Sequence, residues 1–286
     1  MKTNKLVKPF LKWAGGKRQL IAEIMKYIPP QYFQEYTYYE PFLGGGALFF
    51  ELQPKNAVIN DSNSELINCY KVIRDSVEEL IENLEIHKDN NNEKYYYNIR
   101  GIDRTSKIYK SLTPVEKAAR IIYLNKTCYN GLFRVNSQGH FNVPFGKYKN
   151  PKILDEEVLK AVSQYLNNQE ITILNKDFAA ALNTAKSGDF IYLDPPYDPV
   201  SHTASFTGYD VNKFNKDEQI RLKNLFDELT IRGCKVMLSN SDTEFIRDIY
   251  KDYQDKFHVV MATRAINSNA LKRGTVKELL IFNYNI

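Results

Sequence analysis

Short apolar runs alternate along most of the chain with longer stretches of helical periodicity. Seven runs have the length and bounding turn residues of strands: Thr37–Glu40, Ala57–Asn60, Glu170–Leu174, Phe190–Leu193, Cys234–Leu238, Phe257–Thr263 and Lys277–Tyr284. The pattern predicts helices over Leu20–Ile28, Ala47–Leu52, Asn63–Leu84, Pro114–Leu124 and Asp217–Ile231. Alternation of strand and helix predicts an α/β fold with a doubly wound, mostly parallel seven-stranded sheet.

The alternation stops between Leu84 and Pro151, which predicts an inserted, mainly helical domain. Its Pro114 helix begins with a capping box, Thr113 with Glu116 three residues later. After that helix, 128–134 and 141–146 flank the turn-forming Asn136-Ser137-Gln138-Gly139, which favours a β-hairpin. We therefore divide the chain into residues 1–68 with 152–286, and an insert of residues 69–151.

Positive charge gathers in the insert. The chain carries net +5, yet Lys94–Lys152 contains twelve lysines and arginines and only two acids, which leaves net −5 elsewhere. Aromatic residues are interleaved with these charges, a mixture that suits phosphate contacts and base stacking. A solvated helical surface over an aromatic core is the plainer interpretation, but it gives no reason for confining the charge to one segment.

The three cysteines and four histidines have no disulfide or metal-ligand spacing, so we predict no metal. No apolar run approaches the roughly 18 residues of a membrane span, and Met1–Lys5 leads into none. We expect a cytoplasmic protein that does not bind membranes.

Asp194-Pro195-Pro196-Tyr197 directly follows the apolar run Phe190–Leu193 and is the predicted catalytic segment. The Asp194 carboxylate and the Pro195 carbonyl can accept hydrogen bonds from an exocyclic amine, and the Tyr197 ring can stack on a planar base. A strand followed by a tight turn explains the same four residues without any function.

A second group of motifs predicts a nucleotide-like cofactor. Thr37–Glu40 leads into Pro41-Phe42-Leu43-Gly44-Gly45-Gly46, and Asp61 lies about 20 residues beyond the first strand, where an acid typically binds ribose hydroxyls. The dinucleotide fingerprint G-x-G-x-x-G is absent, so no pyrophosphate is required, and a purely structural glycine turn stays open. Asp177 and Phe178 follow the third strand, where they can contact an adenine ring.

Lys12-Trp13-Ala14-Gly15-Gly16-Lys17 precedes the first helix. It lacks the first glycine and the hydroxyl residue of a P-loop, which excludes that motif. Lys17 can hold a ligand carboxylate by a charge-assisted hydrogen bond, and Trp13 can pack on an apolar part of the ligand. The 198–215 stretch is long enough to be a lid or a DNA-contacting loop.

These motifs, in this order and over nearly the whole chain, resemble the DNA adenine methylase (Dam) family, closest to the GATC-specific modification enzymes of the DpnII type. The resemblance implies a Rossmann-like methyltransferase fold whose insert is the target-recognition domain. It implies S-adenosyl-L-methionine as cofactor, bound by the following residues: Trp13, Lys17, Glu40, Phe42, Gly44, Gly46, Asp61, Asp177, Phe178 and Asp194. The run of three glycines at 44–46 departs from many members, which have a less glycine-rich turn, and Gly45 is not among the predicted cofactor residues.

The resemblance also implies double-stranded DNA as partner, with N6 methylation of the adenine in GATC. Arg134 suits bidentate bonding to a guanine. The full predicted DNA-binding set is Lys12, Tyr129, Asn130, Leu132, Arg134, Asn142 and Pro144. A target base must leave the duplex to reach the Asp194 segment, so we expect base flipping and direct in-line transfer.

Two alternatives stay open from the sequence. An N4-cytosine methyltransferase needs the same geometry, although such enzymes more often have serine at the position of Asp194. A non-enzymatic nucleic-acid-binding protein explains the basic insert but not the glycine turn, Asp61 and the Asp194 segment together. The family resemblance makes a companion restriction endonuclease a possible functional partner, without a stable complex, and the oligomeric state is open.

Overall fold

The structure is a computed structural model that describes residues 3–13, 17, 20–28, 31, 35–200, 214–263 and 275–285. The chain divides into two compact units. Unit 1 comprises Met1–Gly16, Gly44–Gln53 and Asn63–Asn175, and unit 2 comprises Lys17–Leu43, Pro54–Ser62 and Lys176–Ile286. The functional boundaries predicted at 69 and 151 stay a prediction. Residues 14–16 of the first motif and most of the predicted 198–215 loop lie outside the described residues.

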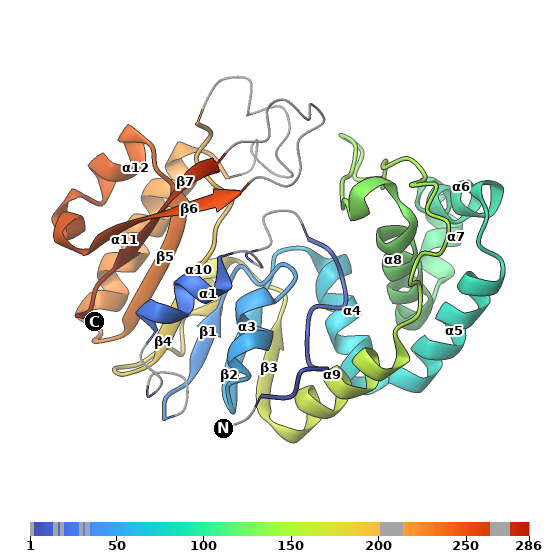
Figure 1. The fold of residues 1–286 in the computed structure, drawn as a ribbon, viewed down its shortest axis with the longest axis horizontal. Helices are drawn as coiled ribbons and strands as arrows, with labels where there is room; N and C mark the ends of the chain where they lie inside the picture. The colour runs from blue at the N-terminus through green and yellow to red at the C-terminus, as the bar shows by residue number, and fades with distance from the viewer. Residues whose placement is uncertain are drawn as a thin grey trace. The chain divides into compact units, whose positions relative to one another are not determined.

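Seven strands form one sheet in the order β3-β2-β1-β4-β5-β7-β6 (Figure 1). Their bounds are β1 Tyr38–Glu40, β2 Asn56–Asn60, β3 Glu170–Leu174, β4 Phe190–Leu193, β5 Lys235–Ser241, β6 Phe257–Thr263 and β7 Thr275–Phe282. All seven predicted strands are confirmed, with ends shifted by at most three residues, as is usual for strand termini.

Strand directions explain where a ligand site belongs. β1 pairs in parallel with β2 and β4, and β4 pairs in parallel with β5, whereas β7 is antiparallel to β5 and β6. The mostly parallel sheet is thus confirmed. In the order 3-2-1-4-5, β2 and β3 are added on one side of β1, whereas β4 and β5 are added on its other side. The boundary between β1 and β4 is therefore a switch point, and doubly wound sheets bind ligands there, at the carboxyl ends of the strands.

Unit 2 has its core between strands and helix α11 (Lys216–Ile231). All four residues of β4 are buried, as expected for a central parallel strand. Leu222, Leu225, Phe226 and Leu229 recur at helical spacing on α11 and pack into the same apolar cluster as β4. Among the described residues, the other helices of unit 2 are α1 Ile21–Ile24, η1 Met25–Tyr27, α10 Phe178–Ala181, α12 Glu244–Ile249 and η5 Lys251–Lys256.

Unit 1 is mainly helical, as predicted for the insert. Apart from β3, its elements are α3 Ala47–Leu52, α4 Ser64–Asp75, α5 Val77–Asp89, α6 Glu93–Gly101, η2 Ile102–Arg104, α7 Ser106–Ser111, α8 Pro114–Thr127, η3 Tyr129–Gly131 and α9 Glu156–Asn168. The capping box of α8 is confirmed: Glu116 N donates to Thr113 Oγ1 at 3.1 Å, and Thr113 N donates to Glu116 Oε2 at 2.7 Å.

The predicted single helix from Asn63 to Leu84 is wrong in one respect, because it divides at Ser76. Ser76 has φ −145° and ψ 44°, outside the helical region. Glu78 and Glu79 fall in the first turn of α5, where negative charge stabilises a helix start. The acidic pair therefore marks a new helix and not the middle of an existing one.

The predicted hairpin is an irregular antiparallel return. Isolated bridges join Cys128 to Phe145 and Val135 to Phe141, and Tyr129–Gly131 forms a 3-10 turn in place of a strand. The tight turn is present, since Gly139 N donates to the Asn136 carbonyl at 2.9 Å. None of the helices in the described part of the chain is long and apolar enough to cross a membrane.

Candidate active site

Asp194 directly follows β4, at the switch point of the sheet. The Lys17 ammonium lies 2.9 Å from Asp194 Oδ1 and 3.7 Å from Glu278 Oε2. These three side chains are 7%, 20% and 15% exposed, respectively, so their charges interact with little screening by water. Lys17, predicted to hold a ligand carboxylate, therefore pairs with two carboxylates of unit 2 itself.

Tyr197 belongs to the same group. Its hydroxyl donates to Glu278 Oε2 at 2.9 Å, and the Lys17 ammonium lies 4.2 Å from the centre of its ring. The hydrogen bond and the cation–π contact together restrain the orientation of the ring. A restrained aromatic ring next to an acceptor carboxylate is the arrangement predicted for binding a planar amine.

Glu278 is a residue that the sequence analysis missed. It lies in β7 opposite Ser241 of β5 and Val260 of β6. In the sequence Glu278 follows Lys277 and directly precedes the apolar run Leu279–Phe282, and charged residues at such a position are usual at solvated strand ends. Only the antiparallel insertion of β7 beside β5 brings it near Asp194, so no local signal identifies it.

Polar side chains behind the segment hold its backbone. The Gln219 Nε2 donates to the Pro196 carbonyl at 2.9 Å, and the Asn240 Nδ2 donates to Gln219 Oε1 at 3.0 Å. Asn240 Oδ1 in turn accepts from the Asp198 N–H at 3.1 Å. Gln219 and Asn240 are buried and hydrogen-bonded, so they give the Asp194 segment a rigid support.

Asn60 ties the strand ends that carry the predicted cofactor residues of unit 2. Its Nδ2 donates to the carbonyls of Pro41 and Lys176, each at 3.0 Å, and its Oδ1 accepts from Lys176 N at 2.8 Å. The turn after β1, the residue Asp61 after β2 and the segment before α10 are thereby held at one edge. Asn60 too was missed, because its contacts join residues 116 positions apart.

The predicted cofactor residues at this edge differ in their surroundings. Glu40 is buried and accepts a 2.6 Å hydrogen bond from the Tyr38 hydroxyl. Phe42 and Phe178 pack together, with ring centres 5.2 Å apart. Asp61 is half-buried.

Asp177, predicted to contact an adenine ring, has partners within unit 2. Its carboxylate caps α10 by accepting from Ala179 N at 3.0 Å, and it pairs with Arg221. The Arg221 guanidinium also lies 4.3 Å from the centre of the Phe178 ring. A ligand contact by Asp177 must therefore share the carboxylate with these partners.

In unit 1 the glycine turn is conformationally demanding. Gly44 and Gly46 have φ values of 51° and 66°, which side chains disfavour. A Cβ on Gly44 would lie 2.9 Å from Trp13 Cδ1, and one on Gly46 would lie 2.8 Å from the Tyr70 hydroxyl oxygen. Trp13 also packs on Phe133, with ring centres 4.8 Å apart. The glycines thus allow close approach of Trp13 and Tyr70 to the turn.

The predicted DNA-reading residues all lie in unit 1. All of them except Lys12 lie on the antiparallel return after α8. Arg134 is exposed, and its Nε donates to Asn142 Oδ1 at 2.8 Å. Tyr129 is 51% exposed, and its N–H donates to the Pro144 carbonyl at 2.8 Å. Of the others, Asn130 is exposed and adopts φ 56°, and Leu132 is half-buried.

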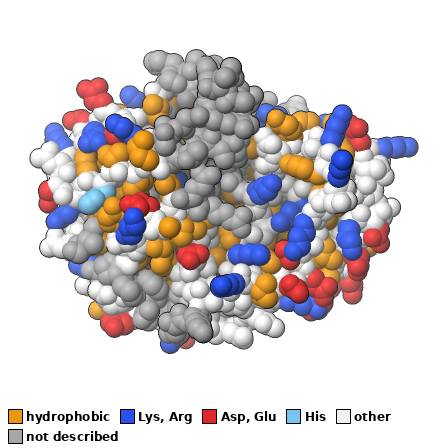
Figure 2. Space-filling model, in the orientation of Figure 1, with side chains coloured by type: hydrophobic (Ala, Val, Ile, Leu, Met, Phe, Trp, Pro, Cys, Tyr) orange, Lys and Arg blue, Asp and Glu red, His pale blue; other side chains and the backbone are white. Residues whose placement is uncertain are grey.

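Basic and apolar side chains are interspersed over the helices α6 to α8 (Figure 2). The segment between Lys94 and Lys152 supplies twelve lysines and arginines. The role of this surface in DNA recognition stays a prediction.

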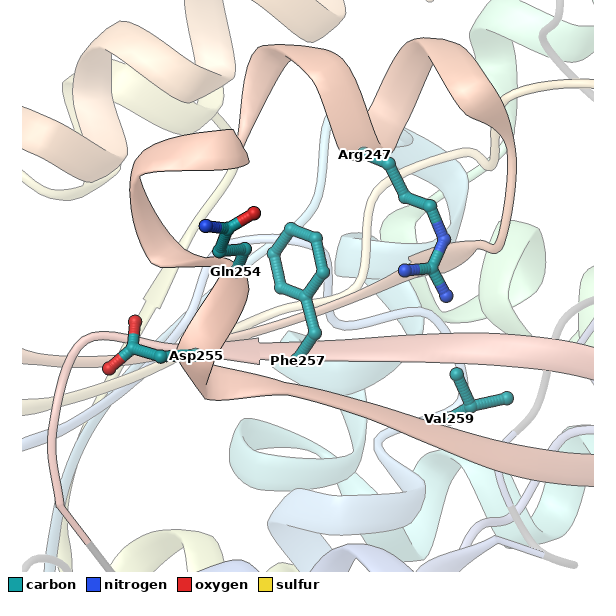
Figure 3. A pocket seen from close by; sticks show the side chains of 5 residues that line it. All are labelled: Arg247, Gln254, Asp255, Phe257 and Val259. Carbon is teal, nitrogen blue, oxygen red and sulfur yellow. The ribbon is translucent and has the colours of Figure 1, made fainter.

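A surface pocket of unit 2 contains none of the predicted site residues. Figure 3 shows its lining, which consists of Arg247, Gln254, Asp255, Phe257 and Val259. Arg247 pairs with Asp242 and packs over the Phe257 ring at 5.7 Å. The Asp194 group, and not this pocket, combines buried charge with a position at the switch point.

Comparison with known proteins shows the family of the chain. A family model described as D12 class N6 adenine-specific DNA methyltransferase matches residues 13–266. The type II methyltransferase M1.LlaDCHI of Lactococcus lactis subsp. cremoris is 47% identical, over 99% of this chain and 98% of its own length. M.MjaIII, a type II methyltransferase of Methanocaldococcus jannaschii, is 44% identical over 97% and 99%. The DNA adenine methylase of Escherichia coli K12 is 34% identical over 98% and 95%.

The family model covers most of the chain, and each of these relatives aligns with nearly all of it. The chain therefore belongs to the D12 class of N6-adenine-specific DNA methyltransferases.

Proposed function

We propose that this methyltransferase modifies N6 of the adenine in double-stranded GATC, as the modification half of a restriction–modification system. The observation that carries the catalytic part is the contact of Asp194 and Tyr197 with Lys17 and Glu278 at the end of β4. The choice of GATC is supported by the resemblance of the Tyr129–Arg134 loop to that of Dam-like enzymes. Two relatives named type II methyltransferases support the restriction–modification role, with a nuclease as functional counterpart.

Enzymes of this family use S-adenosyl-L-methionine, which when bound supplies an electrophilic methyl group. The residue types present in this chain suit the binding of this cofactor. The backbone turn at Gly44 and Gly46 has no room for side chains, and Asp61, half-buried after β2, is a charged acceptor for ribose hydroxyls. In the proposal the cofactor is held by Trp13, Lys17, Glu40, Phe42, Gly44, Gly46, Asp61, Asp177, Phe178 and Asp194.

The target adenine is the second ligand of the proposed site. Its N6 lone pair is delocalised into the ring, so the nitrogen is a poor nucleophile until its two protons are hydrogen-bonded. Asp194 and the Pro195 carbonyl accept those protons, while Tyr197, restrained by Glu278, stacks on the base. Transfer then depends on placing N6 in line with the methyl carbon, without a covalent enzyme intermediate. A base inside a duplex cannot reach Asp194, so the proposal includes base flipping.

The pH dependence of transfer follows from the surroundings of Asp194. Burial raises the pKa of its carboxyl to about 6, with Glu278 adding to the rise and Lys17 opposing it. Tyr192 and Tyr197 also face the carboxyl. A raised pKa means that the acceptor form is present above about pH 6 and lost below it. We expect kcat/KM to fall about tenfold per pH unit below that value, because kcat/KM follows the pKa values of the free enzyme.

Initial rates between pH 5 and pH 8 check this expectation, with duplex binding measured at each pH as the control. A kcat/KM that stays constant down to pH 5, with binding unchanged, would contradict the role of Asp194 as the ionised acceptor.

Arg134 is expected to read one guanine of the site. Its Nε donates to Asn142 Oδ1 and one of its NH2 groups donates to the Asn142 carbonyl, which orients the guanidinium and leaves three N–H donors for O6 and N7 of the base. Replacing Arg134 with Ala should reduce discrimination at one guanine position by about 1–3 kcal/mol. Mapping methylated adenines on plasmid DNA, for the wild type and the variant, measures this.

Lys147→Ala is the matched control, since Lys147 is an exposed cation of the same loop and, as a phosphate contact, should weaken binding to all sequences alike. Wild-type methylation at adenines outside GATC would overturn the proposed recognition sequence. An unchanged site preference in the Arg134 variant would overturn the role of Arg134 alone.

A further inference from the structure

Asn125 lies in the last turn of α8 and is buried, with 1% of its surface exposed. Its Oδ1 accepts from the Lys12 N–H at 2.9 Å, and its Nδ2 donates to the Lys12 carbonyl at 2.8 Å. The same Nδ2 donates to the Gly131 carbonyl at 3.0 Å. One buried amide thus uses both of its donors and an acceptor on two segments more than a hundred residues apart.

Lys12 and Gly131 also touch directly. Gly131 has φ 63°, and a Cβ built on it would lie 2.4 Å from Lys12 Cδ. Only glycine combines that backbone conformation with so close an approach of the lysine stem. The Lys12 ammonium projects beyond the contact to lie 5.9 Å from the centre of the Tyr148 ring. The Lys12 backbone and stem are therefore held against the turn Tyr129–Gly131.

Base reading makes this arrangement sensitive to small displacements. Successive bases of one strand are about 3.4 Å apart, so two side chains that read neighbouring bases need a fixed mutual spacing. Binding groups of a recognition site must be held to within about 0.5 Å. Asn125 provides that constraint for Lys12 and the turn, because its three hydrogen bonds go to backbone atoms that cannot move independently of the side chains they carry.

We propose that Asn125 is a specificity-determining positioning residue, which sets Lys12 in register with the DNA-reading turn Tyr129–Leu132. The inference rests on the proposed function and on the DNA-binding residues predicted from the sequence, among them Lys12, Tyr129 and Leu132. Asn125 is buried and does not touch the DNA itself. It acts through the backbone of Lys12 and Gly131.

The test measures discrimination for each enzyme. Discrimination is the ratio of kcat/KM on the duplex that the wild type prefers to kcat/KM on a duplex carrying one changed base pair. Asn125→Ala removes all three hydrogen bonds, and Asn125→Asp keeps the acceptor for Lys12 N–H while replacing the donor with an oxygen. Both variants should lose about tenfold in discrimination at the position that Lys12→Ala also relaxes. The double variant Lys12→Ala with Asn125→Ala should lose no more than Lys12→Ala alone, because the two residues act as one unit.

Asn68→Ala is the matched control. The Asn68 amide donates to the Pro114 carbonyl at 2.8 Å, so it supports the start of the same helix without contacting Lys12 or the turn. It should leave the discrimination ratio unchanged. Loss of folded protein scales all kcat/KM values equally and does not alter a ratio between two duplexes.

Gly131→Ala disrupts the same contact between Lys12 and the turn, from the side of the turn. This variant tests the inference if Asn125→Ala does not fold. It too should lower discrimination about tenfold at the Lys12 position. Unchanged ratios in the Asn125 and Gly131 variants, or additive losses in the double variant, would overturn the inference. A wild type that shows no sequence preference would instead overturn the proposed function, so the two failures are distinguishable.

Discussion

Replacing Asp194 with Ala is expected to reduce methyl transfer by at least about 10³-fold, because the carboxylate is the acceptor that becomes most important as N6 attacks. The effect should fall on kcat. Duplex binding should change little, since the predicted DNA-reading side chains of unit 1 are untouched. The fold should survive as well, because Lys17 has a second carboxylate, Glu278, at 3.7 Å.

Single-turnover transfer of a labelled methyl group, measured beside gel-shift binding of the same duplex, checks this expectation. Glu228→Gln is the matched control, because Glu228 is an exposed carboxylate on α11 that pairs with Arg232, the residue that follows this helix. Its activity should equal that of the wild type. An Asp194 variant with activity within tenfold of the wild type would refute the assignment of the acceptor.

The strands were predictable because each one corresponds to a short apolar run in its own segment of the sequence. β4 is a continuous apolar run that ends at Asp194, and the order of strand and helix on either side requires a doubly wound sheet. The motif positions then follow from general rules for the carboxyl ends of parallel strands. For the same reason the capping box at Thr113 could be identified from four residues.

The remaining parts of the site depend on contacts between distant segments. Glu278 reaches Lys17 only because β7 enters the sheet next to β5, and Asn60 joins the turn after β1 to the segment before α10. Asn125 holds Lys12 from 113 positions away. Glu278, Asn60 and Asn125 are each a single polar residue next to an apolar run. The periodicity of the sequence carries no information about the distant residue that each of them contacts.

The insert shows the same limit at the level of secondary structure. Helices α6 and α7 were not predicted, because their sequences are rich in tyrosine, lysine and arginine and have no clear apolar stripe. Tyr96 is nevertheless buried, and its hydroxyl donates to the Val143 carbonyl at 2.8 Å. Helix α6 is therefore stabilised by its contact with the antiparallel return after α8 rather than by its own periodicity.

Arg120 is the cation on which these contacts converge. It is 3% exposed, and its NH2 group lies 2.8 Å from Asp103 Oδ2. The guanidinium also donates to the carbonyls of Ile99 and Arg100, each at 2.9 Å. Asp103 Oδ2 accepts a further hydrogen bond, at 2.8 Å, from the N–H of Phe141 in the antiparallel return after α8. The pair thus joins α8, the end of α6 and that return.

Arg120→Ala should therefore destabilise the protein by about 3–5 kcal/mol, since it leaves the Asp103 carboxylate and two carbonyls without their buried donor. The free energy of unfolding in urea, followed by the fluorescence of Trp13 in unit 1, measures the loss. Arg74→Ala is the control: its partner Asp75 is 55% exposed, and such surface pairs contribute at most about 1 kcal/mol. If both variants lost the same small amount, the Arg120–Asp103 pair would not stabilise the attachment of the antiparallel return after α8 to helices α6 and α8.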